Sequence, residues 1–181
     1  MRKIALFLTL MIGFCGFSQK TLEIYNYSVK TISIQMIATK PPSGIYPWCA
    51  SVTPSPITIP PGGTYILENT ANIYRFPFYS PASSPFITNW RRVVAPVPPS
   101  QNATFTNMTS QALWPLGTSQ FFDYISFNVN SAAAGSGNIG ELSFWVTSTT
   151  IINTTHHWGA DYVADYPAAN VIFNTIVFYD I

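Results

Sequence analysis

Apolar and polar side chains alternate along most of the chain beyond its N-terminal segment, and this period of two predicts β-strands. The alternation in residues 21–25 and 32–38 predicts an amphipathic hairpin with one face in the core. Residues 171–179 are apolar on both faces, which predicts a final strand that is central in a sheet or covered on both sides. Only residues 110–114 have a helix-like pattern, and Pro115 ends it after a single turn.

These segments amount to about eight to ten short strands, with no helix long enough to connect parallel strands. The pattern predicts an all-β fold, an antiparallel β-sandwich of which the jelly roll is one form. We expect one domain over residues 20–181, because no linker divides it. The polar, proline-containing stretch at residues 95–110 is expected to be an extended surface connection inside that domain.

The clearest turn signal lies in residues 57–68, where two β-type runs flank Pro60-Pro61-Gly62-Gly63. Pro61 presets φ for the second position of a turn, and Gly62 supplies the positive φ that a type II turn needs next. Pro60 has no N–H to give to a ladder, so the first strand must end there or lie at a sheet edge. The sequence therefore predicts two strands joined by a type II turn.

A second glycine-rich segment, residues 135–140, matches the spacing G-x-G-x-x-G. In a dinucleotide-binding fold a helix begins at the last glycines, and its N-terminus holds the pyrophosphate. Here residues 141–150 are aromatic, β-branched and alternating, which predicts a strand instead of that helix. We therefore expect residues 135–140 to form a hairpin loop, and we expect no nucleotide cofactor.

The first 19 residues have the features of a signal peptide, in which Arg2 and Lys3 precede the apolar run of residues 4–14. This predicts export to the periplasm, the cell surface or the medium. Cys15 offers a second outcome, lipid attachment at a new N-terminus. Phe14 stands where such sites prefer a small residue, so we expect export without a lipid. No later apolar run reaches membrane-spanning length, so we expect no transmembrane segment after the signal peptide.

Charged residues make up only 8% of the chain, and the loss of Arg2 and Lys3 would change 8 Lys+Arg against 7 Asp+Glu to 6 against 7. A nearly neutral domain lacks the basic surface that nucleic-acid binding requires, so that class of partner is excluded. Cys49 would be the one remaining cysteine, which rules out an intramolecular disulfide, and we expect it to be a buried small apolar residue. The core must then depend on the 13 Phe, 10 Tyr and 5 Trp.

Residues with catalytic potential are few and show no diagnostic spacing. His156 and His157 are the only histidines, and adjacent residues on a strand face opposite ways, so both could bind one metal only within a turn. Asp161 and Asp165 are near in sequence but complete no known ligand pattern. No G-x-S-x-G segment positions a nucleophilic serine, and the seven acidic residues form no cluster in the sequence. We predict no metal site and no catalytic residues.

The segment Trp90-Arg91-Arg92 is the strongest candidate for ligand binding. An exposed tryptophan beside a guanidinium forms a flat amphipathic surface suited to sugar rings, carboxylates or aromatic groups. His157-Trp158 is a weaker candidate of the same type. The alternative is that Trp90 belongs to the core and that both arginines reach outward to solvent.

The function that best fits these observations is that of a secreted, non-enzymatic binding or surface protein. Its exposed aromatic and hydroxyl-rich faces would hold a carbohydrate or a protein partner. One alternative is a small secreted hydrolase, which would need a buried acid or histidine of perturbed pKa near a nucleophile in a cleft. The other is a self-assembling structural protein, in which an uncovered edge of the apolar last strand recruits another chain.

Overall fold

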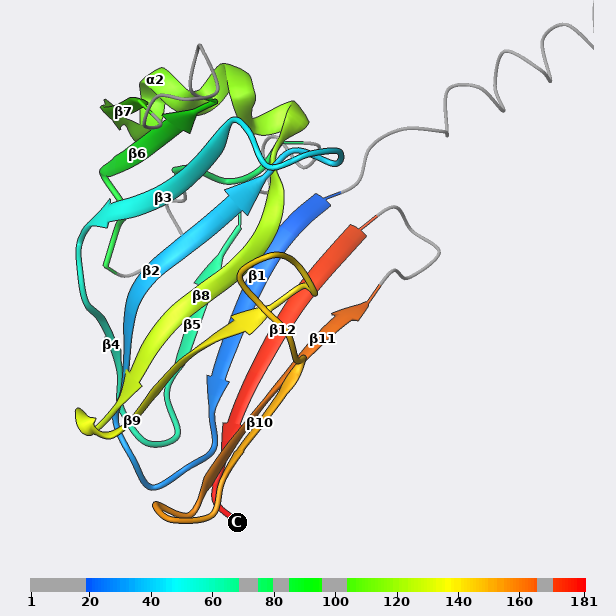
Figure 1. Cartoon of the computed structure of the whole chain (residues 1–181). Helices are drawn as coiled ribbons and strands as arrows, with labels where there is room; N and C mark the ends of the chain where they lie inside the picture. Colours follow the sequence, from blue (N-terminus) through cyan, green and yellow to red (C-terminus); the bar gives the residue numbers. More distant parts are fainter. Residues whose placement is uncertain (1–18, 69–74, 80–84, 96–103, 166–170) are drawn as a thin grey trace, which may run out of the picture.

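The chain folds into two β-sheets that pack face to face, as the alternation predicts (Figure 1). The computed structural model describes residues 19–68, 75–79, 85–95, 104–165 and 171–181, so the expected signal peptide, apart from Gln19, lies outside the described residues. Most strand pairs are antiparallel, which confirms the β-sandwich. No helix among the described residues is long and apolar enough to cross a membrane.

Within the described residues, twelve strands form the two sheets, where about eight to ten are expected. The five-stranded sheet has the order β10-β11-β12-β1-β5, with β10 at Thr150–Asn153, β11 at Trp158–Asp165, β12 at Val171–Tyr179, β1 at Gln19–Asn26 and β5 at Thr64–Leu67. The seven-stranded sheet has the order β7-β6-β3-β2-β8-β9, with β7 at Thr104–Thr109, β6 at Asn89–Val94, β3 at Trp48–Thr53, β2 at Ile32–Lys40, β8 at Phe121–Val129 and β9 at Ser131–Gly140. The short β4, Ile57–Ile59, pairs with β2 beside β3. The stretch expected to be only a connection thus contains a strand, β7.

The last strand, β12, lies between β11 and β1, which confirms the prediction of a central strand. Its pairing with β1 is parallel, so the sheet is not purely antiparallel as expected. The two strands lie at opposite ends of the chain, and no short turn constrains their direction. Because both edges of β12 are already paired, this strand offers no open edge through which a second chain could extend the sheet.

The hairpin expected in residues 21–38 is not formed, because its two strands lie in different sheets, and the two strands on either side of the predicted turn are also divided between the sheets. β1 lies in the five-stranded sheet and β2 in the seven-stranded sheet, while β4 and β5 are divided the opposite way. The predicted turn is present: Gly62 has φ of 70° and the Gly63 N–H donates to the Pro60 carbonyl over 2.9 Å. Local turn geometry was predicted correctly, but the sheet that each strand joins was not.

Asn26 fastens the two crossing connections to each other. Its backbone N–H donates to the Gly63 carbonyl, and its backbone carbonyl accepts from the Gly62 N–H. Its side-chain amide donates to the carbonyls of Lys30, Ile59 and Pro60, at 2.7, 3.1 and 3.0 Å. Because the Asn26 side chain is fully buried, these bonds replace water that cannot reach it.

Large rings fill the space between the sheets. Two groups of three make edge-to-face contacts, the first consisting of Phe76, Phe78 and Trp90, and the second of Phe127, Trp158 and Phe178. Cys49 lies fully buried and is a free thiol, as expected. The burial of Cys49 raises the pKa of its thiol to about 11, so it is protonated at neutral pH and is not a nucleophile.

A short helical segment covers one end of the sandwich, where the sequence predicts a single helical turn. It consists of α2, Ser110–Leu113, with Thr109 as its N-cap, and the 3₁₀-helix Trp114–Ser119. The buried Lys20 Nζ donates to the carbonyls of Gly117, Thr118 and Gln120, at 3.1, 3.0 and 2.6 Å. Burial lowers the pKa of Lys20 to about 8, and the three carbonyls offset part of the cost of burying its charge.

In residues 135–150 the loop and the strand occur in the opposite order to the one predicted. The glycine-rich residues belong to strand β9, and the aromatic residues 141–149 form the loop between β9 and β10. A Cβ on Gly135 would lie 2.7 Å from the Trp158 ring, and a Cβ on Gly137 would lie 3.1 Å from Ile151. The glycines therefore serve close packing of β9 against the five-stranded sheet, and none of them begins a helix.

Candidate functional site

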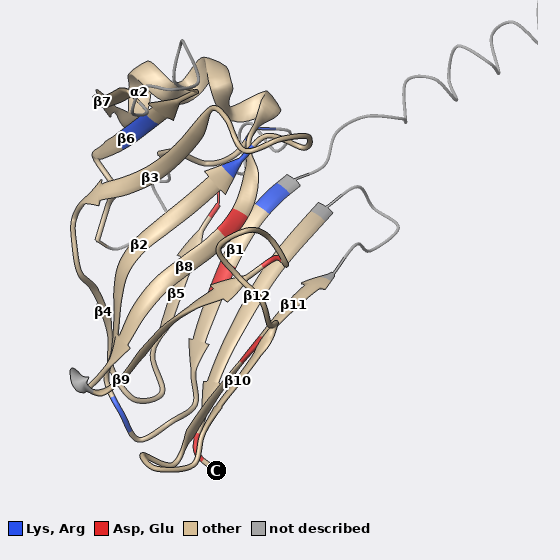
Figure 2. Ribbon diagram, in the orientation of Figure 1, with Lys and Arg blue, Asp and Glu red and all other residues tan. Residues whose placement is uncertain are grey.

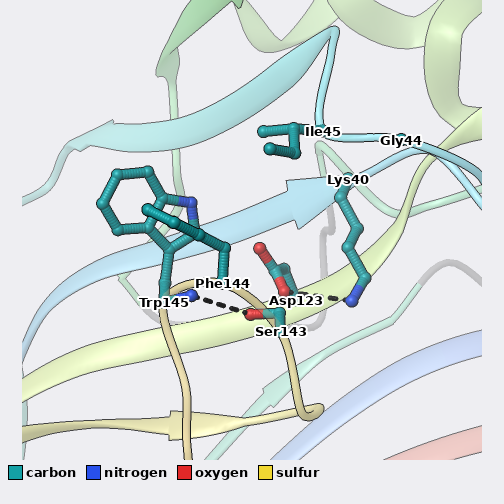
Figure 3. A pocket seen from close by; sticks show the side chains of 7 residues that line it. All are labelled: Lys40, Gly44, Ile45, Asp123, Ser143, Phe144 and Trp145. Carbon is teal, nitrogen blue, oxygen red and sulfur yellow. Dashed lines mark hydrogen bonds and ion pairs between the residues drawn. The ribbon is translucent and has the colours of Figure 1, made fainter.

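A pocket of about 260 Å³ opens on the outer face of the seven-stranded sheet (Figure 3). Two loops form its walls, residues 41–47 between β2 and β3 and residues 141–149 between β9 and β10. The residues that line it are Lys40, Gly44, Ile45, Asp123, Ser143, Phe144 and Trp145. The pocket thus combines exposed aromatic rings with charged groups.

Asp123 reaches this pocket because of a bulge in β8. Ala38 pairs with Tyr124 and Thr39 pairs with Phe122, so Asp123 is an extra residue opposite one step of β2. Phe122 points into the core, where its ring lies 5.7 Å from that of Tyr162. The extra residue allows the Asp123 side chain to lie on the other side of the sheet, facing the pocket loops (Figure 3).

Lys40 links two carboxylates at the pocket. Its Nζ lies 3.3 Å from Asp123 Oδ1 and 3.0 Å from Glu141 Oε2. Although burial opposes the charge of Lys40, the Glu141 and Asp123 carboxylates together raise its pKa. Burial raises the pKa of Asp123, and the Lys40 charge and the Ser143 hydroxyl oppose that shift. Asp123 Oδ1 is buried and accepts no hydrogen bond from the described residues, so its contact with Lys40 is an ion pair without a well-formed hydrogen bond.

The loop that carries the aromatic residues is anchored at its base and exposed at its tip. The Ser143 N–H donates to the Val146 carbonyl over 3.0 Å, and the Val146 N–H donates back over 3.4 Å. Phe144 and Trp145 occupy the tip, with side chains 75% and 48% exposed and ring centroids 4.8 Å apart. Val146 is buried beside Ala38 and Tyr124, with Met36 and Trp48 packed against this group. The buried anchor limits the motion of the two rings.

We expect Asp123→Asn to be at least as stable as the wild type at pH 7, because burial of the carboxylate costs more than its partners return. Well below pH 3.8 this carboxyl is protonated in both the folded and the unfolded state. As pH rises, the carboxyl ionises first in the unfolded state. The free energy of unfolding of the wild type therefore falls between the unfolded pKa and the higher folded pKa. The advantage of the variant in urea midpoint should therefore be present at pH 7 and absent near the acid limit. A variant less stable at pH 7 would contradict this account of the site.

The structure places both candidate tryptophans in the core, so neither offers an exposed ring to a ligand, and for Trp90 the alternative of a core position is the correct one. The exposed fraction is 0% for Trp90 and 2% for Trp158. Each indole N–H is satisfied internally, by the Phe78 carbonyl over 3.0 Å and the Ala134 carbonyl over 3.1 Å. A buried indole stabilises the fold through its large apolar area, and burial carries no penalty for the N–H once that donor has a partner.

The other candidate residues do not converge on one site. Arg91 is exposed on β6, Arg92 is partly buried near Cys49, and His157 lies in the turn between β10 and β11. His156 shares that turn, where His157 has φ of 51° and both side chains are exposed. Among the residues that the structure describes, no group of three His, Cys, Asp or Glu side chains is placed to hold a metal ion.

The pocket residues could not be found by motif, because they come from separate parts of the chain. Lys40, Asp123 and Glu141 lie on three different segments, and the loop residues alternate like a strand. The bulge that turns the Asp123 side chain toward the pocket has no sequence signature. Trp145 is the pocket residue most typical of a binding site. In the sequence, however, nothing distinguishes it from the tryptophans of the core.

Comparison of the chain with models of protein families, with curated proteins and with solved structures found no match of any of the three kinds.

Proposed function

We propose that this chain is an exported binding protein that holds a carbohydrate in the pocket beneath Phe144 and Trp145. The observation that supports the proposal most is the placement of these two exposed rings directly beside the Lys40–Asp123 ion pair. Neither feature strengthens the core. Exposed adjacent aromatic side chains cost solubility, so their presence on a fixed loop favours contact with a ligand.

A sugar ring matches both halves of the pocket. The flat face of an indole packs against the C–H face of a sugar, while charged side chains exchange hydrogen bonds with its hydroxyl groups. Lys40 offers donors, and the carboxylates of Asp123 and Glu141, both paired with Lys40, offer acceptors. Hydrogen bonds to charged groups are the stronger kind, so they fix the orientation of the sugar.

The test is to screen the mature protein on a glycan array and to measure the strongest ligand by titration calorimetry. We expect Trp145→Ala to weaken that ligand by about tenfold or more, which corresponds to about 1.4 kcal/mol of lost contact. The control is Tyr27→Ala, which removes another exposed ring, 67% exposed, stacked on Tyr25 between β1 and β2. A blank array, or equal loss in both variants, would overturn the proposal.

A second candidate function, glycoside hydrolysis, is favoured by the raised pKa of Asp123, since a buried carboxyl of this kind can act as a general acid. Glu141 supplies a second carboxylate nearby. Lys40 bridges the two groups, however, and occupies the space in which a scissile bond or a water would sit. Incubation of the identified ligand with the protein, followed by product analysis, separates the two: turnover lost in Asp123→Asn would establish the hydrolase.

A further inference from the structure

The outer face of the seven-stranded sheet is hollowed at two more places beside the proposed pocket. One hollow, of about 240 Å³, is lined by Gln35, Met36, Trp48, Ala50, Ser51, Val52, Ser55 and Arg91. The next, of about 350 Å³, has Arg91, Phe105 and Asn107 as its lining among the described residues. Met36 and Trp48 also pack with Val146, which is adjacent to Trp145. The three hollows therefore follow one another from β8 across β2, β3 and β6 to β7.

Arg91 is common to the two further hollows and is held in a defined position. It pairs with Ala50 on β3 and with Asn107 on β7, and the small Ala50 leaves space beside the guanidinium. Its guanidinium carbon lies 5.8 Å from the centroid of the Phe105 ring. Phe105 is itself 62% exposed, so this cation–π pair lies on the surface. The attraction between the guanidinium and the ring favours rotamers of Arg91 that keep its head group beside Phe105.

The positive charge of Arg91 is not neutralised by the described part of the chain. The ion pairs found there join Lys30 to Asp180 and Lys40 to Asp123 and Glu141, and none includes Arg91. No hydrogen bond from its guanidinium to a described residue is present either. In Figure 2, β6 carries basic residues, whereas its neighbours β3 and β7 carry no charged residue. A partner with a negative charge would find both donors and space here.

We propose that Arg91 binds the carboxylate of an acidic oligosaccharide whose far end occupies the Trp145 pocket. This inference rests on the proposed function. A guanidinium presents a planar fork of N–H donors that matches the two oxygens of a carboxylate, and Asn107 can add an amide donor. Three strand spacings separate β8 from β6, or about 14 Å, so one sugar unit cannot reach both places. The ligand is therefore an oligomer that carries uronic acid units.

The experiment compares oligogalacturonates with their methyl-esterified forms, by titration calorimetry at two salt concentrations. We expect the wild type to bind the acidic form about tenfold more tightly at low salt, with the difference reduced at high salt. Arg91→Gln should bind the acidic and the esterified oligosaccharides with the same affinity, that of the wild type for the ester. Arg91→Lys should keep only part of the preference for the acidic form, because lysine lacks the planar fork of donors. Trp145→Ala should weaken both forms. Lys30→Gln, which removes a charge paired with Asp180, is the control and should behave as wild type.

The outcomes are distinct for the two proposals. If the wild type binds neither form nor any other glycan, the proposed function itself fails. If it binds both forms equally and Arg91→Gln changes nothing, the pocket stands and the role of Arg91 is wrong. Preference for sulfated over carboxylated oligosaccharides, or for an acidic peptide over every glycan, would also overturn the assignment. A monosaccharide that binds with an affinity dependent on Trp145 but not on Arg91 would support the two-site arrangement.

Discussion

Asn26→Ala is expected to lower the free energy of unfolding by about 3–5 kcal/mol, because the side chain satisfies several buried groups at once. Three carbonyls, those of Lys30, Ile59 and Pro60, would lose their donor. Asn26 Oδ1 also accepts from the Ser28 N–H and hydroxyl, at 3.1 and 2.7 Å. Water can replace only some of these bonds, since Asn26 is completely buried where both connections between the sheets meet.

Urea denaturation followed by tryptophan fluorescence would measure the loss, with Asn138→Ala as the control. Asn138 is exposed on β9, so its replacement should change the unfolding free energy by at most about 0.5 kcal/mol. Ser28→Ala should give an intermediate result, because it removes one hydroxyl and leaves the three carbonyl bonds intact. If Asn26→Ala matched the Asn138 control, Asn26 would not be what holds the two connections together.

The same region shows what the sequence could and could not predict. The period of two in residues 32–38 is enough to predict a strand with a buried face, and Gly62 is enough to predict the turn. Neither feature says whether the next strand stays in its sheet. A type II turn at Pro60 is compatible with a hairpin and with a crossing, and the choice depends on a contact with Asn26, more than thirty residues away. Long-range hydrogen bonds of this kind leave no local pattern.

The candidate site was harder to predict than the fold for a related reason. The alternation of apolar and polar residues places Trp145 on one face of a predicted strand. Alternation does not show whether a second strand is present to pair with that segment. In the folded chain the segment has no partner strand, and the bonds between Ser143 and Val146 close it into a loop. Asp123 becomes part of the site only through one extra residue in β8. Trp90 shows the opposite case, where a residue that looks suited to binding is needed by the core.

Gly140→Ala is expected to destabilise the protein by about 3 kcal/mol or more and to abolish ligand binding at the pocket. A Cβ at this position would overlap the carbonyl oxygen of Asp123 and would lie 2.5 Å from Tyr124 Cα. Both are backbone atoms, so no side-chain rotation can relieve the overlap. Strands β8 and β9 would have to separate at the bulge, where the Glu141 N–H donates to that same Asp123 carbonyl over 2.8 Å.

Gly137→Ala is the matched control, since it lies on the same strand within the same glycine-rich segment. Its Cβ would meet the ends of two side chains, Ile151 at 3.1 Å and Phe127 at 3.3 Å, and movements of a few tenths of an ångström in these side chains can relieve the contacts. We therefore expect Gly137→Ala to lose less than half as much stability and to keep its affinity for the ligand. Equal effects in the two variants would show that the glycines act through strand packing in general. A selective effect at Gly140 would show that the glycine motif, which positions a phosphate in other folds, here positions a carboxylate by permitting close contact at the bulge.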